Sequence, residues 1–338
     1  MSAISYQQIV QARACLAMYL PQTRLQPAPS VSMLANAEVA LKLESEQPTG
    51  SFKVRGALHA LVVNLQRRKI SEVVTASTGN HGAAVAFAAS LLHVACTVFL
   101  PVNPNPTKRG RIIGLGANVR DTGRDLSEAA AHAASYAERD GAYFLNDATD
   151  RDLPAGPATI ACEILEQRPD TDAFIVPVGD SAFIRGIAAA VRHLRPQARV
   201  IGVQAEGAPA YYRSWKAGKV VLPDASSTIA DGLDPQAPLP ENVEEIHRLL
   251  DDFCLVSDEE MLATMRHLIL EERVLSEPAG AAATAALIHR KGFSFGKKPT
   301  AIVSGCNISP QVLRSMCAHP LLWQGQETVT ATNKLHQV

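Results

Sequence analysis

One lysine, Lys53, follows a turn-forming Pro-Thr-Gly-Ser segment and opens a helical run in the stretch LESEQPTGSFKVRGA. A lysine at a helix start beside Phe52 can point into a cleft and lose its contact with water. Such burial lowers the pKa of an amine, so Lys53 is a candidate nucleophile or base. Taken alone, it is more typical of a solvated lysine without a chemical role.

A second candidate is the loop STGNHG, which begins at Ser77 and follows the strand-like run EVVTA. Gly79 lets backbone N–H groups converge on an anion, and Thr78 and Asn80 add side-chain donors. The loop can therefore bind a carboxylate or a phosphate. The alternative is an ordinary helix cap, and His81 by itself is more typical of structure than of catalysis.

Two later loops occupy the same kind of position. GDSAF begins at Gly179 after the run FIVPV, and SGCN begins at Ser304 after the run TAIV. Asp180 and Ser181 also form a good helix N-cap, and the local residues favour that interpretation. Asp180 would repel a phosphate unless its side chain points away.

Short β-branched runs, which would position these loops, alternate with alanine-rich helical segments. The predicted strands are EVALKLE (38–44), EVVTAS (72–77), ACTVFLP (95–101), NVRDTG (118–123), AYFLN (142–146), DAFIVPVG (172–179), RVIGVQAE (199–206) and PTAIVSG (299–305). This alternation predicts a doubly wound α/β protein with mainly parallel sheets and helices on both faces. Ligands bind such sheets where strands end and helices begin, which is where the candidate loops lie.

The composition limits the class of partner. The 338 residues are 47% hydrophobic and 19% charged, and 32 Lys and Arg balance 33 Asp and Glu to a formal net charge of -1. We therefore expect a globular protein with a small-molecule partner, and neither nucleic acid nor a membrane surface. Six scattered cysteines without a CxxC pair favour a reducing compartment. With no predicted signal peptide or membrane span, the expected location is the cytoplasm.

The strand pattern is interrupted by a small βαβ region, which predicts one domain inserted into another. We expect a large domain from residues 1–71 and 148–323, a small domain from residues 72–147, and a polar tail from residues 324–338.

Taken together, these segments resemble the fold-type II pyridoxal-phosphate enzymes of the serine/threonine dehydratase and serine racemase family, whose fold is tryptophan synthase β-like. The resemblance covers roughly Tyr6 to Leu313. The motifs that carry it occur in family order, and they are KLESEQPTGSFKVRGA, TASTGNHGAAVAFAA, LPVNPNPTKRGRIIGLGANV, VPVGDSAFIRG, STIADGL, SEPAGAAATAAL and IVSGCNIS.

The resemblance implies pyridoxal phosphate as cofactor and a role for each matching residue. Lys53 would form the Schiff base and later take the α-proton, with Phe52 against the ring and Asn80 bonded to the cofactor 3-hydroxyl. Ser304 would face the pyridine nitrogen. The substrate carboxylate would be bound by Ser77, Thr78, Gly79, Asn80 and His81. The phosphate would be bound by Gly179, Asp180, Ser181, Ala182 and Phe183.

The implied reaction is α,β-elimination of a β-hydroxy-α-amino acid of the L-threonine or L-serine type. A neutral hydroxyl at Ser304 makes a weaker electron sink than a carboxylate would, which suits prompt loss of a β-leaving group. The products would be a 2-oxo acid and ammonia, with the leaving hydroxyl protonated by the cofactor phosphate. The resemblance also implies a homodimer.

Four departures from the family pattern matter. The phosphate loop is GDSAF where relatives commonly have a run of glycines. Gln204 and Ala210 stand where some relatives place acidic metal ligands, so we expect no divalent metal and leave a monovalent ion open. Thr78 replaces the serine with which serine racemases reprotonate Cα. Threonine makes racemisation less efficient than elimination, so amino-acid racemisation stays only an alternative. Ala148 replaces a larger residue, which leaves a bulkier substrate as another alternative, such as phenylserine or a hydroxyectoine-pathway intermediate.

Overall fold

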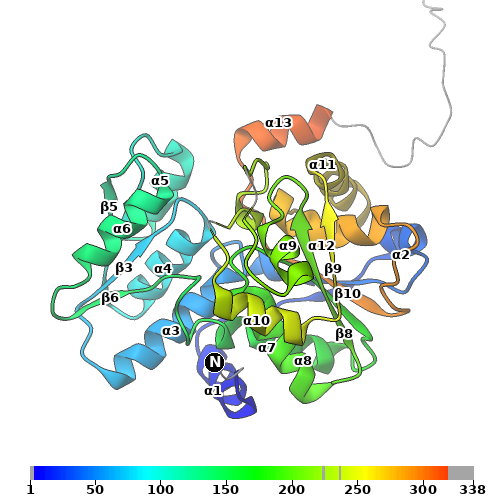
Figure 1. The fold of residues 1–338 in the computed structure, drawn as a ribbon, viewed down its shortest axis with the longest axis horizontal. Coiled ribbons are helices and arrows are strands. Elements are labelled where there is room, and N and C mark those ends of the chain that lie inside the picture. The colour runs from blue at the N-terminus through cyan, green and yellow to red at the C-terminus, as the bar shows by residue number, and fades with distance from the viewer. Residues whose placement is uncertain (1–3, 223–224, 236, 319–338) are drawn as a thin grey trace, which may run out of the picture.

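The fold is built around two separate β-sheets, which lie side by side in Figure 1. A computed structural model describes residues 4–222, 225–235 and 237–318. The predicted tail at residues 324–338 lies outside these ranges. None of the described helices is long and apolar enough to cross a membrane.

The larger sheet has six strands in the order β1-β2-β10-β7-β8-β9. All neighbouring pairs are parallel except β1 with β2. The strands are β1 (Leu25–Pro27), β2 (Ala40–Leu43), β7 (Ala173–Pro177), β8 (Arg199–Ala205), β9 (Asp252–Val256) and β10 (Pro299–Val303). Leu43 pairs with Val303, so the carboxyl ends of β2 and β10 lie level at one edge of the sheet.

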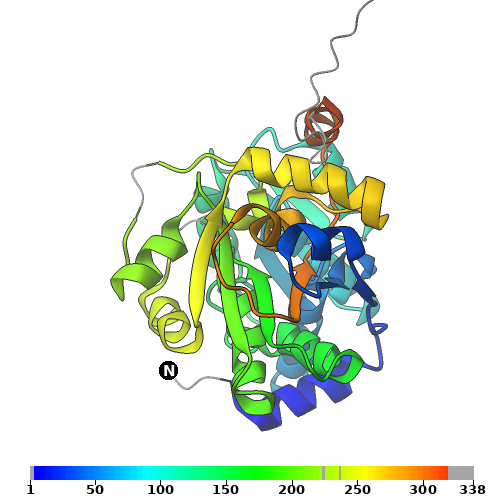
Figure 2. The same cartoon turned by 90° about the vertical axis from the view of Figure 1, so that its right-hand side faces the viewer.

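Helices cover both faces of this sheet, as the turned view in Figure 2 shows. In β7, Phe174 and Val176 point into the core on one face and Ile175 into the core on the other. The first face packs against α1 (Tyr6–Leu16), α7 (Ala155–Gln167), α8 (Ala182–Leu194), α9 (Ala210–Ala217) and α10 (Pro240–Leu249). The second packs against α2 (Pro29–Ala35), α11 (Asp258–His267), α12 (Pro278–His289) and α13 (Pro310–Ala318). Burial on both faces explains why the strands are continuous apolar runs.

The smaller sheet has four parallel strands in the order β5-β4-β3-β6. They are β3 (Glu72–Ala76), β4 (Ala95–Leu100), β5 (Asn118–Asp121) and β6 (Ala142–Phe144). One face packs against α3 (Lys53–Arg67), α4 (Asn80–Leu91) and α5 (Pro106–Gly114), and the other against α6 (Leu126–Tyr136). Because α3 also packs against α7, it connects the two sheets.

Short helical turns complete the described elements, namely η1 (Glu44–Glu46), η2 (Asp231–Leu233) and the π-turn η3 (Leu268–Glu272). All eight predicted strands are confirmed, as is the doubly wound, mainly parallel fold. The two strands that were not predicted are β1, an antiparallel edge strand of three residues, and β9. All strands of the smaller sheet fall within residues 72–147, although the domain boundaries themselves stay a prediction.

Candidate active site

The loops that follow β3, β6, β7 and β10 line one cavity of about 600 Å³ between the two sheets. Parallel strands bring their carboxyl ends to one edge of a sheet, so residues far apart in the sequence meet there. The volume is within the range of small-molecule sites. The three candidate loops of the sequence and Lys53 therefore contribute to one site.

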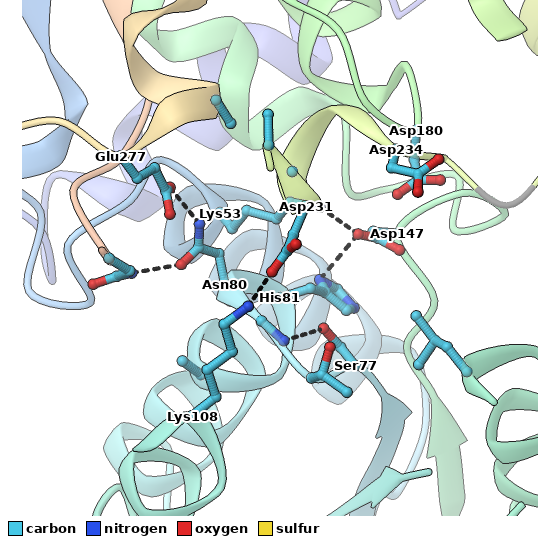
Figure 3. Close-up of a pocket in the computed structure, with 18 of the residues that line it drawn as sticks. Lys53, Ser77, Asn80, His81, Lys108, Asp147, Asp180, Asp231, Asp234 and Glu277 are labelled. Atoms are coloured by element: carbon cyan, nitrogen blue, oxygen red, sulfur yellow. Dashed lines mark hydrogen bonds and ion pairs between the residues drawn. The ribbon is translucent and has the colours of Figure 1, made fainter. Parts of the chain in front are cut away.

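Lys53 is the first residue of α3 and lies at the centre of the labelled residues in Figure 3. Its side chain is 18% exposed, and its Nζ donates a hydrogen bond to Oδ2 of Asp147, in the loop after β6. The expectation that Lys53 points into a cleft is confirmed. Asp147 was not among the predicted residues.

The expected lowering of the Lys53 pKa is wrong. Burial does act in that direction, but the carboxylates of Asp147, Asp180 and Glu277 outweigh it and hold the pKa above its ordinary value. The same ion pair keeps the pKa of Asp147 below its ordinary value although burial opposes it. The structure therefore contains a lysine ammonium paired with a carboxylate.

Asn80, the first residue of α4, is held by polar contacts at both ends of its amide. Its Nδ2 donates to Oε1 of Glu277 at 2.6 Å, and its Oδ1 accepts from Nδ2 of Asn307 at 2.5 Å. Burial raises the pKa of Glu277 to about 7, although the Asn80 contact opposes this. An amide nitrogen carries two hydrogens, so Asn80 retains one donor for a ligand.

The rest of the STGNHG loop lines the cavity at the start of α4. No described side chain caps this helix, although Oγ of Ser77 accepts the backbone N–H of Gly79 at 3.3 Å. His81 is 3% exposed, and its Nε2 donates to the Leu145 carbonyl at 3.1 Å. Burial lowers the pKa of His81. The ring is thus a buried neutral group whose contact is structural, while Thr78 faces the cavity with the loop backbone.

The GDSAF loop leads into α8 without any described side-chain cap, so the capping interpretation of this loop is wrong. Ser181 adopts a left-handed conformation with φ of 69°. Its Oγ is buried beside the Tyr211 hydroxyl, without a hydrogen bond of ordinary geometry among the described groups. Phe183 stacks on Phe52 with ring centroids 3.7 Å apart. Asp180 does not point away from the cavity, because its carboxyl lies close enough to Lys53 and Asp147 to interact with both.

Ser304 follows β10 and is 4% exposed. Its Oγ donates to the Ala279 carbonyl at 3.5 Å, which is a long contact that leaves the hydroxyl free to turn. Ser304 shares a recess with Phe52, Lys53 and the loop that begins at Gly179.

The cavity also contains charged residues that sequence reasoning missed. Lys108 and Asp231 form an ion pair, and Arg111 donates to Asn307 and to the Thr49 carbonyl. Lys108 and Arg111 belong to α5, whose motif was quoted for the resemblance without a role. Asp147 had the same signal as the predicted loops, because it follows a predicted strand directly.

The described residues contain no group of three or more His, Cys, Asp or Glu side chains that could hold a metal ion. Where some relatives place an acid, Oε1 of Gln204 accepts the backbone N–H of Tyr212 at 3.0 Å. Gln204 therefore has a structural contact at the start of α9.

The residues present fit pyridoxal phosphate. Lys53 supplies an amine for the aldehyde. The start of α8, which no described side chain caps, and the buried Ser181 hydroxyl beside it suit the phosphate. Asn80 has a free amide hydrogen for a phenolic oxygen, and the Ser304 hydroxyl is a neutral partner for a ring nitrogen.

Comparisons with known proteins agree with this chemistry. The family described as pyridoxal-phosphate dependent enzyme matches residues 16–305. An L-threonine ammonia-lyase of Geobacter sulfurreducens is 36% identical over 288 residues, which cover 85% of this chain and 72% of the relative. A catabolic L-threonine dehydratase of Escherichia coli K12 is 33% identical over 307 residues, which cover 90% of this chain and 93% of the relative.

Among solved structures, maize serine racemase superposes with a TM-score of 0.87 at 29% identity, covering 94% of this chain and 98% of that one. The family match spans more than half of the chain, and both the fold and the donor set of the cavity accord with it. The chain belongs to the pyridoxal-phosphate-dependent enzymes of fold type II, and it is a lyase of the serine/threonine dehydratase type that uses pyridoxal phosphate.

Proposed function

We propose that the protein converts a β-hydroxy-α-amino acid of the L-threonine or L-serine type to a 2-oxo acid and ammonia. One observation carries the proposal. The amine of Lys53 shares a cavity with two helix starts that no described side chain caps, those of α4 and α8. A helix start binds anions, so this arrangement supports one site for a substrate carboxylate and another for a phosphate.

The residues that would hold the cofactor are Phe52, Lys53, Asn80, Ser304 and the loop from Gly179 to Phe183. When bound, pyridoxal phosphate supplies an electron sink that lets the α-proton leave an amino acid.

The loop from Ser77 to His81 orients the substrate. Its backbone N–H groups and the Thr78 hydroxyl bind the carboxylate, so that the Cα–H bond faces Nζ of Lys53. Orientation of this kind can contribute about 7–11 kcal/mol to lowering a barrier. Lys53 in its neutral form then removes the α-proton as the general base. The β-hydroxyl takes a proton, which the cofactor phosphate would supply, and departs as water.

The test is an assay of 2-oxo acid and ammonia with the enzyme loaded with pyridoxal phosphate. The substrates are the stereoisomers of serine, threonine and phenylserine, and the recovered amino acid is analysed on a chiral column. We expect stoichiometric 2-oxo acid and ammonia from the L-isomers of serine or threonine. Inversion of configuration without 2-oxo acid would contradict the proposal and support a racemase.

The assay includes phenylserine and chiral analysis because two observations favour alternative functions, namely a bulkier substrate and racemisation. Ala148 lines the cavity of about 600 Å³, which favours a bulkier β-hydroxy amino acid such as phenylserine or a hydroxyectoine-pathway intermediate. Similarity to maize serine racemase supports racemisation. Threonine at position 78 opposes it, because the added methyl restricts the rotamer of the hydroxyl.

We further infer that the enzyme acts as a homodimer in the cytoplasm. All six cysteines are free, which supports a reducing compartment. The dimer rests on the family resemblance. Sedimentation equilibrium should give twice the mass of one chain, and a monomer would contradict the inference.

A further inference from the structure

The amide of Asn80 lies in the middle of a chain of hydrogen bonds between side chains that line the cavity. Its Nδ2 donates to Oε1 of Glu277 at 2.6 Å (Figure 3), and its Oδ1 accepts from Nδ2 of Asn307 at 2.5 Å. Oδ1 of Asn307 in turn accepts a hydrogen bond from Nη1 of Arg111. The chain therefore runs from a guanidinium at one end to a carboxyl at the other.

The direction of these hydrogen bonds is fixed at the Arg111 end. A guanidinium can only donate and a backbone carbonyl can only accept. Nη1 of Arg111 therefore requires the oxygen of the Asn307 amide, and the Thr49 carbonyl, 3.0 Å from Nδ2 of Asn307, requires its nitrogen. Nη2 of Arg111 donates to the same carbonyl at 2.5 Å. With Asn307 held in this orientation, its second N–H donates to Asn80 and requires the amide oxygen there.

Asn80 is consequently held with its nitrogen toward Glu277. A carboxyl oxygen can accept a hydrogen bond whether or not the group is protonated, so the Glu277 end of the chain agrees with this direction. One hydrogen of the Asn80 amide is then left for a ligand. An amide turned the other way would present its oxygen at the same place and could not donate there.

Two glycines leave the space that the chain of hydrogen bonds occupies. A Cβ atom on Gly50 would lie 2.8 Å from Oδ1 of Asn307, and one on Gly305 would lie 2.2 Å from Oε1 of Glu277. Gly50 also has a φ of 66°, which other residues rarely adopt. The chain of hydrogen bonds therefore accounts for a glycine in each of the PTGS and SGCN motifs.

The same chain of hydrogen bonds joins the two sheets. Arg111 is in α5 and Asn80 is in α4, and both helices pack on the smaller sheet. Asn307 follows β10 of the larger sheet, and Glu277 precedes α12, which packs on that sheet. Each of the three bonds between side chains therefore crosses from one part of the molecule to the other.

We propose that Arg111 and Asn307 are positioning residues that hold the Asn80 amide with its free N–H toward the phenolic oxygen of pyridoxal phosphate. The assignment rests on the proposed function, in which Asn80 is one of the residues that hold the cofactor. A hydrogen-bond donor at this oxygen favours its charged form. Arg111 thus acts on the cofactor through two intervening amides.

The test compares the absorbance of cofactor-loaded wild type, Asn307→Asp and Arg111→Met. A charged phenolic oxygen gives the bound cofactor a visible band, and a protonated one gives a near-ultraviolet band. Aspartate at position 307 offers only acceptors, so it requires the Asn80 amide to turn round. We expect the ratio of the visible to the near-ultraviolet band to fall about 10-fold, the effect of one hydrogen bond to a charged group.

In Arg111→Met the ratio of the two bands should fall by a smaller factor of about 3, because the Thr49 carbonyl still favours the original orientation of Asn307. With L-threonine, kcat should fall in both variants while KM stays unchanged, since neither residue is assigned a contact with the substrate. Arg111 is exposed, so Arg111→Met tests the proposal even if Asn307→Asp does not fold.

Two further variants separate positioning from a general effect on the helix. Arg109→Met is the matched control, because Arg109 is also in α5 and pairs with Asp121, and neither residue lines the cavity. It should leave the band ratio and kcat unchanged. Arg111→Lys keeps a group that can only donate and should retain most of the wild-type ratio.

A wild-type band ratio in Arg111→Met or in folded Asn307→Asp would overturn the proposal, because the Asn80 amide would then keep its direction without the chain. A raised KM in Arg111→Met with an unchanged spectrum would make Arg111 a substrate contact and would also overturn it. Wild type that binds the cofactor but forms no 2-oxo acid would contradict the proposed function instead. The band ratios would still test the direction of the Asn80 amide in that case.

Discussion

At the scale of single residues, the cavity combines groups whose charge states are set by burial and by each other. Glu277 is the clearest case apart from Lys53 and Asp147. Its carboxyl accepts a hydrogen bond from one amide and has no direct cationic contact among the described hydrogen bonds and ion pairs. Its pKa is raised to about 7. The folded protein therefore retains a proton there that the unfolded chain has already lost at pH 5–6.

Glu277→Gln should increase stability at high pH. Between pH 4.5 and 7, the unfolded carboxyl is ionised while the folded one stays protonated, so the free energy of unfolding falls as the pH rises. The free energy of unfolding of the glutamine variant does not fall in this way. Its advantage over wild type should therefore grow by up to about 3 kcal/mol from pH 4 to pH 8. Urea unfolding of the cofactor-free proteins at these two pH values measures it, with exposed Glu138→Gln as control. Parallel pH profiles for wild type and Glu277→Gln would contradict this account of Glu277.

The site residues that could be predicted from the sequence are those that a local motif identifies without any knowledge of their contacts. Lys53, Asn80 and Ser304 lie at helix starts or strand ends within recognisable motifs. Asp147 and Glu277 matter because of what they contact, and their partners Lys53 and Asn80 are 94 and 197 residues away in the sequence. The raised pKa of Lys53 was missed for the same reason, since burial could be inferred locally and the opposing carboxylates could not.

At the scale of elements, α3 is fixed to the larger sheet by a buried ionic network just behind the active-site lysine. Arg55 is 2% exposed, and it donates to both oxygens of Glu44 and both oxygens of Glu163. Lys42 completes the network with a 2.6 Å contact to Glu163. These contacts join α3 to β2, η1 and α7. They fix the helix start from which Lys53 projects.

Arg55→Met should be strongly destabilising. It leaves Glu44 buried without its ion-pair partner, and loss of one member of a buried pair costs about 3–5 kcal/mol. Chemical denaturation at pH 7 measures the change. Arg67→Met on the same helix is the control, because its side chain is 59% exposed and its pair with Asp152 contributes about 1 kcal/mol at most. Equal losses in the two variants would show that the network does not anchor α3.

The strands of these elements could be predicted because β-branched apolar runs are a local property of the sequence. The network could not, because Lys42, Glu44 and Glu163 lie in segments whose contact requires the finished fold. The strand β1 was missed for a related reason. β1 is only three residues long, and pairing with β2 in the opposite direction is what makes it a strand.

At the scale of the whole molecule, the cavity is formed jointly by the two sheets. Contacts across it join α4 to the loop before α12 through Asn80 and Glu277, and α5 to η2 through Lys108 and Asp231. A ligand in the cavity therefore touches both parts of the chain, and its binding energy stabilises both.

Pyridoxal phosphate should raise the melting temperature of the whole molecule in one step. At 100 times its dissociation constant, a ligand that binds only the folded state adds about 2.7 kcal/mol. Differential scanning calorimetry with and without the cofactor measures this shift. Two transitions, of which only one moves with the cofactor, would contradict a cavity shared by both sheets.

The measurement that tests the central claim most directly is the loss of function in Lys53→Ala. Purified wild type with pyridoxal phosphate should show a visible absorbance band and release ammonia and 2-oxo acid from threonine or serine. Lys53→Ala should lose the band, and its rate of ammonia and 2-oxo acid release should fall at least about 1000-fold. The substitution removes both the covalent attachment of the cofactor and the base. The exposed substitution Lys69→Ala should change neither. Full ammonia release by Lys53→Ala would contradict the account.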